Sequence, residues 1–329
     1  MNHKIGILLT SRNNYDFMGK KWCKQTLEES DGNIFPVLNI DEDSSAEEKQ
    51  KGRELCDKYN NMTYMDREEP GMHYNIDSAI RFFGDDVKYI VWFQHDCWPL
   101  QKDFFHIFNS IVENGKLDNF GTIGFNSLAQ NIFKRDNQHE EIIKEFREGK
   151  MPLGVLSRSV LESAGARDLY YCGKKVKNRI GHPVGKDKFS KPCAIAVPVW
   201  YAIAVNVSLF KKEIDLDRDM RFFRSWDDIA FQFLNKNIYN IVLPDLYIEH
   251  RPDLKKLFGL PALSVKRVKK DDTYHSAVGV GPEAWIKYWG WDFEHPSTFE
   301  KVKDKYKDTL LYKFYKYDYT KGPLRSFEI

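Results

Sequence analysis

Two adjacent carboxylates begin a predicted amphipathic helix in residues 225–234, whose sequence is SWDDIAFQFL. The first turn of a helix has unpaired backbone N–H groups, and the helix dipole favours negative charge there. We therefore expect Asp227 and Asp228 to be ionised, and an ionised carboxylate facing a cleft can act as a general base. His250 ends a later strand-like segment, and imidazole is a usable metal ligand. These residue types predict a metal-assisted group transfer.

The elements that would position these residues alternate along the chain. Strands are predicted at about 5–9, 34–40, 89–93, 122–125, 199–205 and 241–243, and helices at about 16–29, 45–59, 74–83 and 102–112 and after residue 226. This alternation is typical of a mostly parallel sheet covered by helices. The pattern is looser between about 136 and 193, where a polar segment indicates a surface loop.

Polar residues follow several of these predicted strands. They are Thr10, Ser11, Arg12 and Asn13, then Asp41 and Asp43, then Gln94, His95 and Asp96, and finally His250. In a parallel α/β sheet, ligands bind beyond the carboxyl ends of the strands. Each residue alone is equally well explained as a helix cap. Their joint occurrence predicts a ligand site at one edge of the sheet.

Asp96 is the candidate ligand for a divalent cation at that edge. Mg²⁺ and Mn²⁺ accept one or two carboxylates and fill their other positions with phosphate oxygens and water. Asp96 and His250 would therefore suffice if a diphosphate were also bound. The alternative is that Asp96 is only a turn residue, because Trp98 and Pro99 are expected to turn the chain directly after it.

The motifs of several common enzyme classes are missing from the sequence. It contains no Gly-rich phosphate loop, dinucleotide fingerprint, Walker sequence or serine-hydrolase elbow. The chain has 50 basic and 48 acidic residues, so a role with nucleic acid would depend on local basic patches. Ordinary dehydrogenase and nucleotide-triphosphatase activities are therefore not supported.

The order of the strand-end motifs resembles a GT-A-fold glycosyltransferase, most similar to family 2. The resemblance covers about residues 4–250, from the polar residues after the first strand to the WDD helix start and His250. It implies an α/β, GT-A-like fold with a mostly parallel central sheet flanked by helices. Residues 1–250 would form the catalytic domain, with a nucleotide-sugar half at about 1–125 and an acceptor and catalytic half at 126–250. Residues 251–329 would form a mixed C-terminal extension.

The resemblance also implies an inverting, metal-assisted transfer of a sugar, most often from a UDP-sugar, to an acceptor hydroxyl. The implied roles are donor binding by Thr10, Ser11, Arg12, Asp41, Gln94 and Asp96, binding of Mn²⁺ or Mg²⁺ by Asp96 and His250, and catalysis by Asp228 with Asp227. Asp228 would be the base, and Asp227 would orient the acceptor or the base. Trp226 would stack on a sugar of the acceptor or of the donor, with a buried anchor at the helix start as the equal alternative. Gln94 replaces the first metal-motif Asp of the family and cannot supply charge to a cation.

Two other functions stay open. Arg251, Lys255 and Lys256 are placed where they could bind phosphate, and the basic residues 266–270 could close over the site as part of a loop. A basic segment with Lys174, Lys175, Lys177, Arg179, Lys186 and Lys188 is either a solvated surface or suits an anionic acceptor. Such an acceptor includes DNA with hydroxymethylated bases, beside the glycan or small molecule of the main hypothesis. The alternative from another class is a catalytically inactive, GT-A-shaped binding protein, which Gln94 suggests.

The remaining features concern location and the C-terminal aromatic residues. Five cysteines without paired spacing indicate free thiols in a reducing compartment. The chain has no signal-peptide pattern and no apolar run near the roughly 20 residues that span a bilayer, so we expect a cytoplasmic protein. Trp285, Tyr288, Trp289 and Trp291 fit core packing or an aromatic platform. The aromatic residues among Lys313 and Lys316 would also suit peripheral contact with a membrane.

Overall fold

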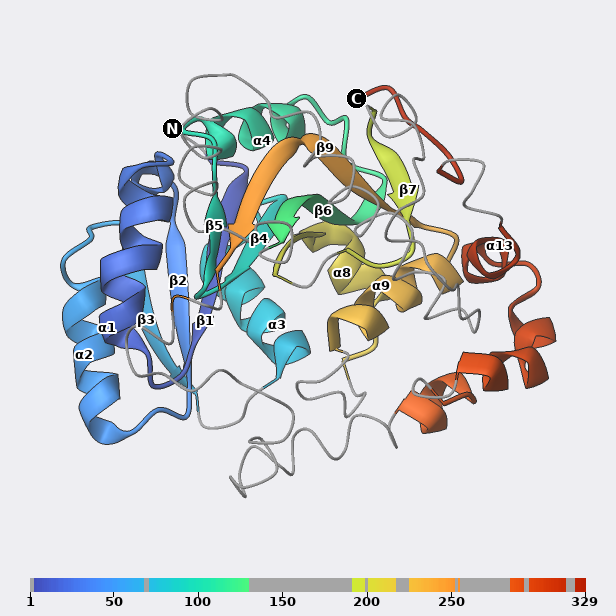
Figure 1. Ribbon diagram of the computed structural model, residues 1–329, viewed down its shortest axis with the longest axis horizontal. Coiled ribbons are helices and arrows are strands. Elements are labelled where there is room, and N and C mark those ends of the chain that lie inside the picture. Colours follow the sequence, from blue (N-terminus) through green and yellow to red (C-terminus); the bar gives the residue numbers. More distant parts are fainter. Residues whose placement is uncertain are drawn as a thin grey trace.

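A nine-stranded sheet forms the centre of the protein (Figure 1). The computed structural model describes residues 3–67, 71–129, 191–198, 201–216, 225–251, 254, 285–292, 296–317 and 323–329. The strand order is β3 (Met62–Arg67), β2 (Val37–Glu42), β1 (Ile5–Ser11), β4 (Tyr89–Gln94), β8 (Ala202–Asn206), β6 (Phe120–Ala129), β9 (Tyr239–His250) and β5 (Cys97–Pro99), and β7 (Cys193–Ile195) pairs with β9. Within these ranges, no helix is long and apolar enough to cross a membrane.

Most strands run in one direction. β1 pairs in parallel with β2 and with β4, and β2 pairs in parallel with β3. β8 is antiparallel to both β4 and β6, so β6 and its parallel partner β9 run the same way as β4. β5 and β7 are antiparallel to β9. The sheet is mostly parallel, as predicted, and β1, β2, β4 and β9 end at the same edge.

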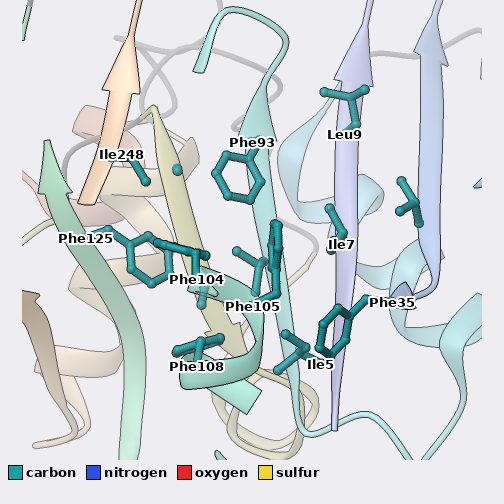
Figure 2. Close-up of a cluster of buried hydrophobic side chains, with 14 of the residues drawn as sticks. Ile5, Ile7, Leu9, Phe35, Phe93, Phe104, Phe105, Phe108, Phe125 and Ile248 are labelled. Carbon is teal, nitrogen blue, oxygen red and sulfur yellow. The ribbon is translucent and has the colours of Figure 1, made fainter. Parts of the chain in front are cut away.

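Helices cover both faces of this sheet. They are α1 (Tyr15–Phe17), η1 (Met18–Glu28), α2 (Ala46–Cys56), α3 (Met72–Phe83), α4 (Phe104–Glu113), α8 (Val207–Glu213) and α9 (Ser225–Asn235). One apolar layer joins alternate side chains of β1 and β4 to α1, η1, α2 and α4. Figure 2 shows Phe104, Phe105 and Phe108 of α4 among strand residues of this layer. The other layer joins the opposite face of β1 and β4 to α3, α8 and α9.

The C-terminal segments form a third apolar cluster, which includes residues of α9. Its elements are η6 (Pro296–Lys301), η7 (Lys303–Tyr306), α13 (Leu310–Lys316) and the helical turns that contain Trp285 and Trp289. Phe231 of α9 lies 5.4 Å from Trp285 and 5.7 Å from Trp289 between ring centroids. These tryptophans therefore pack in a core. The division of the chain at residue 250 stays a prediction.

Three local features differ from the sequence prediction. The first is β3, which was not predicted because this partly exposed strand contains Asp66 and Arg67 instead of an apolar run. The second is the turn, which lies at His95 and Asp96, before β5, and not at Trp98 and Pro99. Residues 97–99 stay extended because β9 offers them an antiparallel partner.

The third difference is the length of the last strand. β9 continues from Tyr239 to His250 although Pro244 lies inside it. Proline cannot donate to the ladder, so a strand normally tolerates it only at an edge or a bulge. The pairing with β6 shifts register between Phe125 and Asn126, and the Asn126 side chain donates to the Pro244 carbonyl at 3.0 Å. The bulge therefore allows the strand to continue beyond Pro244, so that it ends with His250 at the ligand edge.

Candidate functional site

The turn after β4 and the end of β9 bring Asp96 and His250 together. His250 pairs with Cys97 across the β5 and β9 ladder, and its Nε2 lies 3.5 Å from Asp96 Oδ1. The Asp96 side chain is 2% exposed and the His250 side chain 13%. The structure thus places the two candidate metal ligands side by side, as the strand-end reasoning expected.

The residues around His250 hold its ring in one orientation. The Tyr201 ring stacks on it, with centroids 3.7 Å apart and an interplanar angle of 16°. The neighbouring Glu249 accepts a hydrogen bond from Trp98 Nε1 at 3.0 Å and pairs with Arg251 at 3.2 Å. The Gln94 backbone N–H donates to the Tyr201 carbonyl at 2.9 Å, which joins the end of β4 to the stacked pair. These contacts pack and hydrogen-bond the residues on both sides of His250.

This pair of ligands fits a hard divalent cation. Ligand atoms lie about 2.1 Å from Mg²⁺, so two of them can contact one ion while lying up to about 4.2 Å apart. The 3.5 Å between His250 and Asp96 meets this limit. The described part of the chain contains no group of three or more His, Cys, Asp and Glu that could hold a metal. Phosphate oxygens and water would have to complete the coordination.

α9, which contains the acidic pair Asp227 and Asp228 in its first turn, also begins at the ligand edge of the sheet. Only three residues, 236–238, separate α9 from the start of β9, and Tyr239 pairs with Phe120 at the start of β6. α9 therefore ends at the opposite edge, and its 11 residues extend about 16 Å back along the sheet. This direction places Asp227 and Asp228, in the first turn, near the carboxyl ends of the parallel strands.

Asp228 is completely buried, and among the described residues three side chains donate hydrogen bonds to it. His73 Nε2 lies 3.1 Å from Oδ2, and Gln232 Nε2 donates to Oδ2 at 2.7 Å. Trp289 Nε1 donates to Oδ1 at 2.7 Å. A carboxylate removed from water requires such donors. Asp227 is 3% exposed, so both members of the pair are buried.

The sequence did not predict the contacts of His73, Gln232 and Trp289 with Asp228. The start of α3, where His73 lies, follows β3, and without that strand nothing placed His73 at the ligand edge. Gln232 stands four residues after Asp228, a helical spacing that was available as a signal. Trp289 had no local signal, since its contact with Asp228 depends on how the C-terminal cluster packs.

Trp226 lies in the core layer between the sheet and α9. It is 5% exposed, and its ring packs on Trp92 of β4 with centroids 5.2 Å apart. These contacts are those of a buried anchor at the helix start. Binding of the acceptor by Trp226 stays a prediction.

Thr10, Ser11 and Asp41 lie within the last residues of β1 and β2, which end later than predicted, and these polar residues have partners within the protein. Ser11 pairs with Asp41 in the strand register, and Asp41 is completely buried. The Asp41 carboxylate accepts the Tyr15 hydroxyl and, at 2.8 Å, the Ser44 backbone N–H. Burial and the neighbouring carboxylate raise the pKa of the Tyr15 hydroxyl. Thr10 Oγ1 accepts a hydrogen bond from a tryptophan N–H at 3.1 Å. These contacts hold the strand ends in place, and donor binding by them stays a prediction.

The loops after β1 and β2 are also locked to each other. Asn13 and Asp43 have φ values of 50° and 62°, a left-handed conformation that Asn and Asp tolerate better than most residues. The Asn13 side chain accepts the Ser45 backbone N–H at 2.8 Å, and Ser44 Oγ accepts the Asn13 backbone N–H at 2.9 Å. Arg12, 22% exposed, pairs with Asp43 at 3.6 Å. Arg12 is more accessible than Thr10 and Ser11, the predicted donor-binding residues at the end of β1.

Several sequence predictions fall outside the described residues. They concern the basic segment with Lys174, Lys175, Lys177, Arg179, Lys186 and Lys188, the later basic residues Lys255, Lys256 and 266–270, and Cys172. An anionic acceptor such as modified DNA therefore stays a prediction. Cys23, Cys56 and Cys97 are free thiols, as expected, and the structure shows that they are buried. Phe314 and Tyr315, two of the aromatic residues considered for membrane contact, are buried in the C-terminal cluster.

No protein-family model and no curated protein matches this chain. Solved structures do resemble it. GalNAc-T7 with UDP, GalNAc and Mn²⁺ aligns with 93% of this chain and 57% of its own, at 9% identity and a TM-score of 0.51. The mannosyltransferase PcManGT from Pyrobaculum calidifontis, in complex with GDP-Man and Mn²⁺, aligns over 92% and 74%, at 11% identity and a TM-score of 0.45. S. aureus TarS 1–349 aligns over 87% and 72%, at 11% identity and a TM-score of 0.40.

The likeness to GalNAc-T7 confirms the predicted fold class. The chain has a GT-A-like α/β fold, in which helices flank a large and mostly parallel sheet. It spans 57% of the GalNAc-T7 chain. At 9% identity the likeness concerns the fold alone, because one fold hosts many activities. Membership of family 2 stays a prediction.

Proposed function

We propose that this protein is a glycosyltransferase that moves a sugar from a nucleotide-sugar to an acceptor hydroxyl. The observation that carries the proposal is the presence of two acidic centres at one edge of a GT-A-like sheet. One is the Asp96 and His250 pair, whose nearest atoms lie 3.5 Å apart, and the other is the buried Asp227 and Asp228 pair of α9. GalNAc-T7, which has a similar fold, was solved with UDP and Mn²⁺. This supports a sugar donor that contains a nucleoside diphosphate.

The reaction we propose inverts the configuration at the anomeric carbon of the transferred sugar. The acceptor oxygen forms a bond to that carbon, the bond from the carbon to the diphosphate oxygen breaks, and the bonding electrons leave with the diphosphate. Asp228 accepts the proton of the attacking hydroxyl, and Asp227 orients the acceptor. Asp96 and His250 would hold a Mn²⁺ or Mg²⁺ ion, which supplies positive charge against the leaving diphosphate. Thr10, Ser11, Arg12, Asp41 and Gln94 would lie on the donor side, with a UDP-sugar as the first donor to test.

Substitution of the acidic pair tests the proposed chemistry. Asp228→Asn keeps the size of the side chain but cannot accept the proton, so donor hydrolysis should fall by about 100- to 10,000-fold. Donor affinity should persist in this variant. Asp245→Asn, an exposed carboxylate of β9, is the matched control. A crippling effect of Asp227→Asn alone would exchange the two roles. Full activity in both variants, or no hydrolysis of any nucleotide-sugar by the wild type, would contradict the proposal.

Substitution of Asp96 tests the metal site. UDP with Mn²⁺ should raise the thermal midpoint of the wild type, because a ligand that binds only the folded state stabilises it. Asp96→Ala should remove the part of this increase that depends on Mn²⁺. Asp245→Ala, a substitution of an exposed residue of β9, controls for the loss of a carboxylate elsewhere in the protein. Unchanged Mn²⁺-dependent stabilisation of Asp96→Ala would exclude Asp96 as a ligand.

A further inference from the structure

Three N–H groups from separate parts of the protein converge on the Asp228 carboxylate. His73 is in the first turn of α3, Gln232 is in α9, and Trp289 belongs to the C-terminal cluster. We infer that His73 and Trp289 are positioning residues, which fix the orientation of Asp228 so that it can accept the proton of the attacking acceptor hydroxyl. This inference rests on the proposed function, and it makes the C-terminal cluster a component of the catalytic site.

The Trp289 side chain is held on several sides, so the direction of its N–H is fixed. Its ring packs on Phe231 and on Trp285, with centroids 5.7 and 5.8 Å apart. The Tyr306 hydroxyl donates to the Trp289 backbone carbonyl at 2.7 Å. Gly290, with a φ of 76°, follows directly and stops the helix in a conformation that suits glycine. This packing aims the indole N–H at Asp228 Oδ1, 2.7 Å away.

His73 is fixed in a similar way from another part of the fold. It is 1% exposed, and two residues later the Asn75 side chain donates to Glu42 at 2.6 Å, which ties the start of α3 to β2. Within the described part of the chain, His73 Nδ1 has no hydrogen-bond partner. The ionised carboxylate of Asp228 can only accept hydrogen bonds, so the contact requires an N–H group at His73 Nε2. His73 therefore acts as a donor to the carboxylate.

If His73 and Trp289 had a purely structural role, we would expect a different result. A buried carboxylate that only joins three segments would lose stability when a donor is removed, and kcat per folded molecule would not change. A positioned base would lose kcat, because small errors in the orientation of a reacting group are costly. The KM for the nucleotide-sugar would change little, because His73 and Trp289 contact Asp228 and not the nucleotide-sugar. The split between kcat and KM therefore separates the two roles.

The test uses purified full-length protein and Mn²⁺-dependent release of nucleoside diphosphate from UDP-glucose and GDP-mannose. Trp289→Phe keeps an aromatic ring and removes the N–H, and His73→Leu removes the donor of α3. Each should lower kcat by about 10- to 100-fold, the effect of losing a hydrogen bond to a charged group. Trp291→Phe, in the same cluster, where the ring packs on Phe299, is the control and should keep kcat. His73→Gln, which retains an N–H donor at similar reach, should recover most of the lost activity.

Combining the variants with Asp228→Asn completes the test. If Trp289 and His73 act through Asp228, adding Trp289→Phe or His73→Leu to Asp228→Asn should lower kcat no further, because residues that act as a unit are not additive. Fully additive losses, or wild-type kcat in both Trp289→Phe and His73→Leu, would overturn the inference while the transferase itself stands. A wild-type protein that hydrolyses neither donor would overturn the proposed function and this inference together.

Discussion

Glu42, the last residue of β2, should make the protein less stable at neutral pH than in mild acid. It is 6% exposed and accepts hydrogen bonds from the Asn75 side chain at 2.6 Å and the Gly71 backbone N–H at 3.4 Å. Burial raises its pKa above the ordinary value of 4.5, while these two donors and the charges of Arg67 and Arg12 act in the opposite direction. The carboxyl therefore ionises less readily in the folded than in the unfolded chain.

The sign of the effect follows from the raised pKa. Below about pH 4.5 Glu42 is protonated in both the folded and the unfolded chain, so its ionisation does not lower the free energy of unfolding. As the pH rises from there through the raised folded pKa, the unfolded chain loses the proton more readily and stability falls. Every tenfold decrease in the acidity of Glu42 on folding corresponds to about 1.4 kcal/mol. Glu42→Gln keeps an acceptor oxygen for both donors and cannot ionise, so at pH 7 it should recover the stability that the wild type loses.

Urea unfolding of the wild type and Glu42→Gln between pH 4 and pH 7.5 measures this difference. The advantage of the variant should be largest at pH 7 and vanish near pH 4. Glu47→Gln, an exposed carboxylate in the first turn of α2 with 81% side-chain exposure, is the control and should show no such gain. An advantage of Glu42→Gln that is absent at pH 7, or that grows towards acid pH, would refute the assignment of burial as the dominant cause.

Three further predictions concern a buried amide, the stacked ring and the acceptor. Asn240→Ala should cost about 2–4 kcal/mol in urea unfolding, because Asn240 is completely buried and bonds to β6, to α9 and to the segment after β7. Tyr201→Leu should weaken Mn²⁺ binding in titration calorimetry while Tyr201→Phe retains it, since the ring stacks on His250. Charge reversal at Lys174, Lys175 and Lys177 should flatten the salt dependence of acceptor binding only if the acceptor is anionic.

The sheet could be predicted because its central strands are almost uninterrupted apolar runs. Residues 5–9 and 89–93 are buried on both faces in the structure, as such runs indicate in a parallel sheet. The approach of Asp96 to His250 could be predicted too, because both follow strands that end at one edge. β3 could not be predicted, because an edge strand that contains Asp66 and Arg67 has the composition of a loop.

The donors to Asp228 could not be predicted from local pattern. His73 is 155 residues from Asp228 in sequence and Trp289 is 61 residues away, so neither contact leaves a helical or strand spacing. Trp289 looked like an ordinary core tryptophan, and it is one, since its ring packs against Phe231. Its indole N–H has a second use that becomes visible only when the C-terminal cluster is placed beside α9.

One reversed strand explains how the two acidic centres come to share an edge. β8 is antiparallel to β4 on one side and to β6 on the other, so β6 and β9 regain the direction of β4. His250, at the end of β9, therefore meets the turn that follows β4. The short link from α9 to β9 then directs the start of α9 to that same edge. If β8 were parallel to β4 and kept its antiparallel pairing with β6, then β6 and β9 would run against β4, and His250 would end on the far side of the sheet from Asp96.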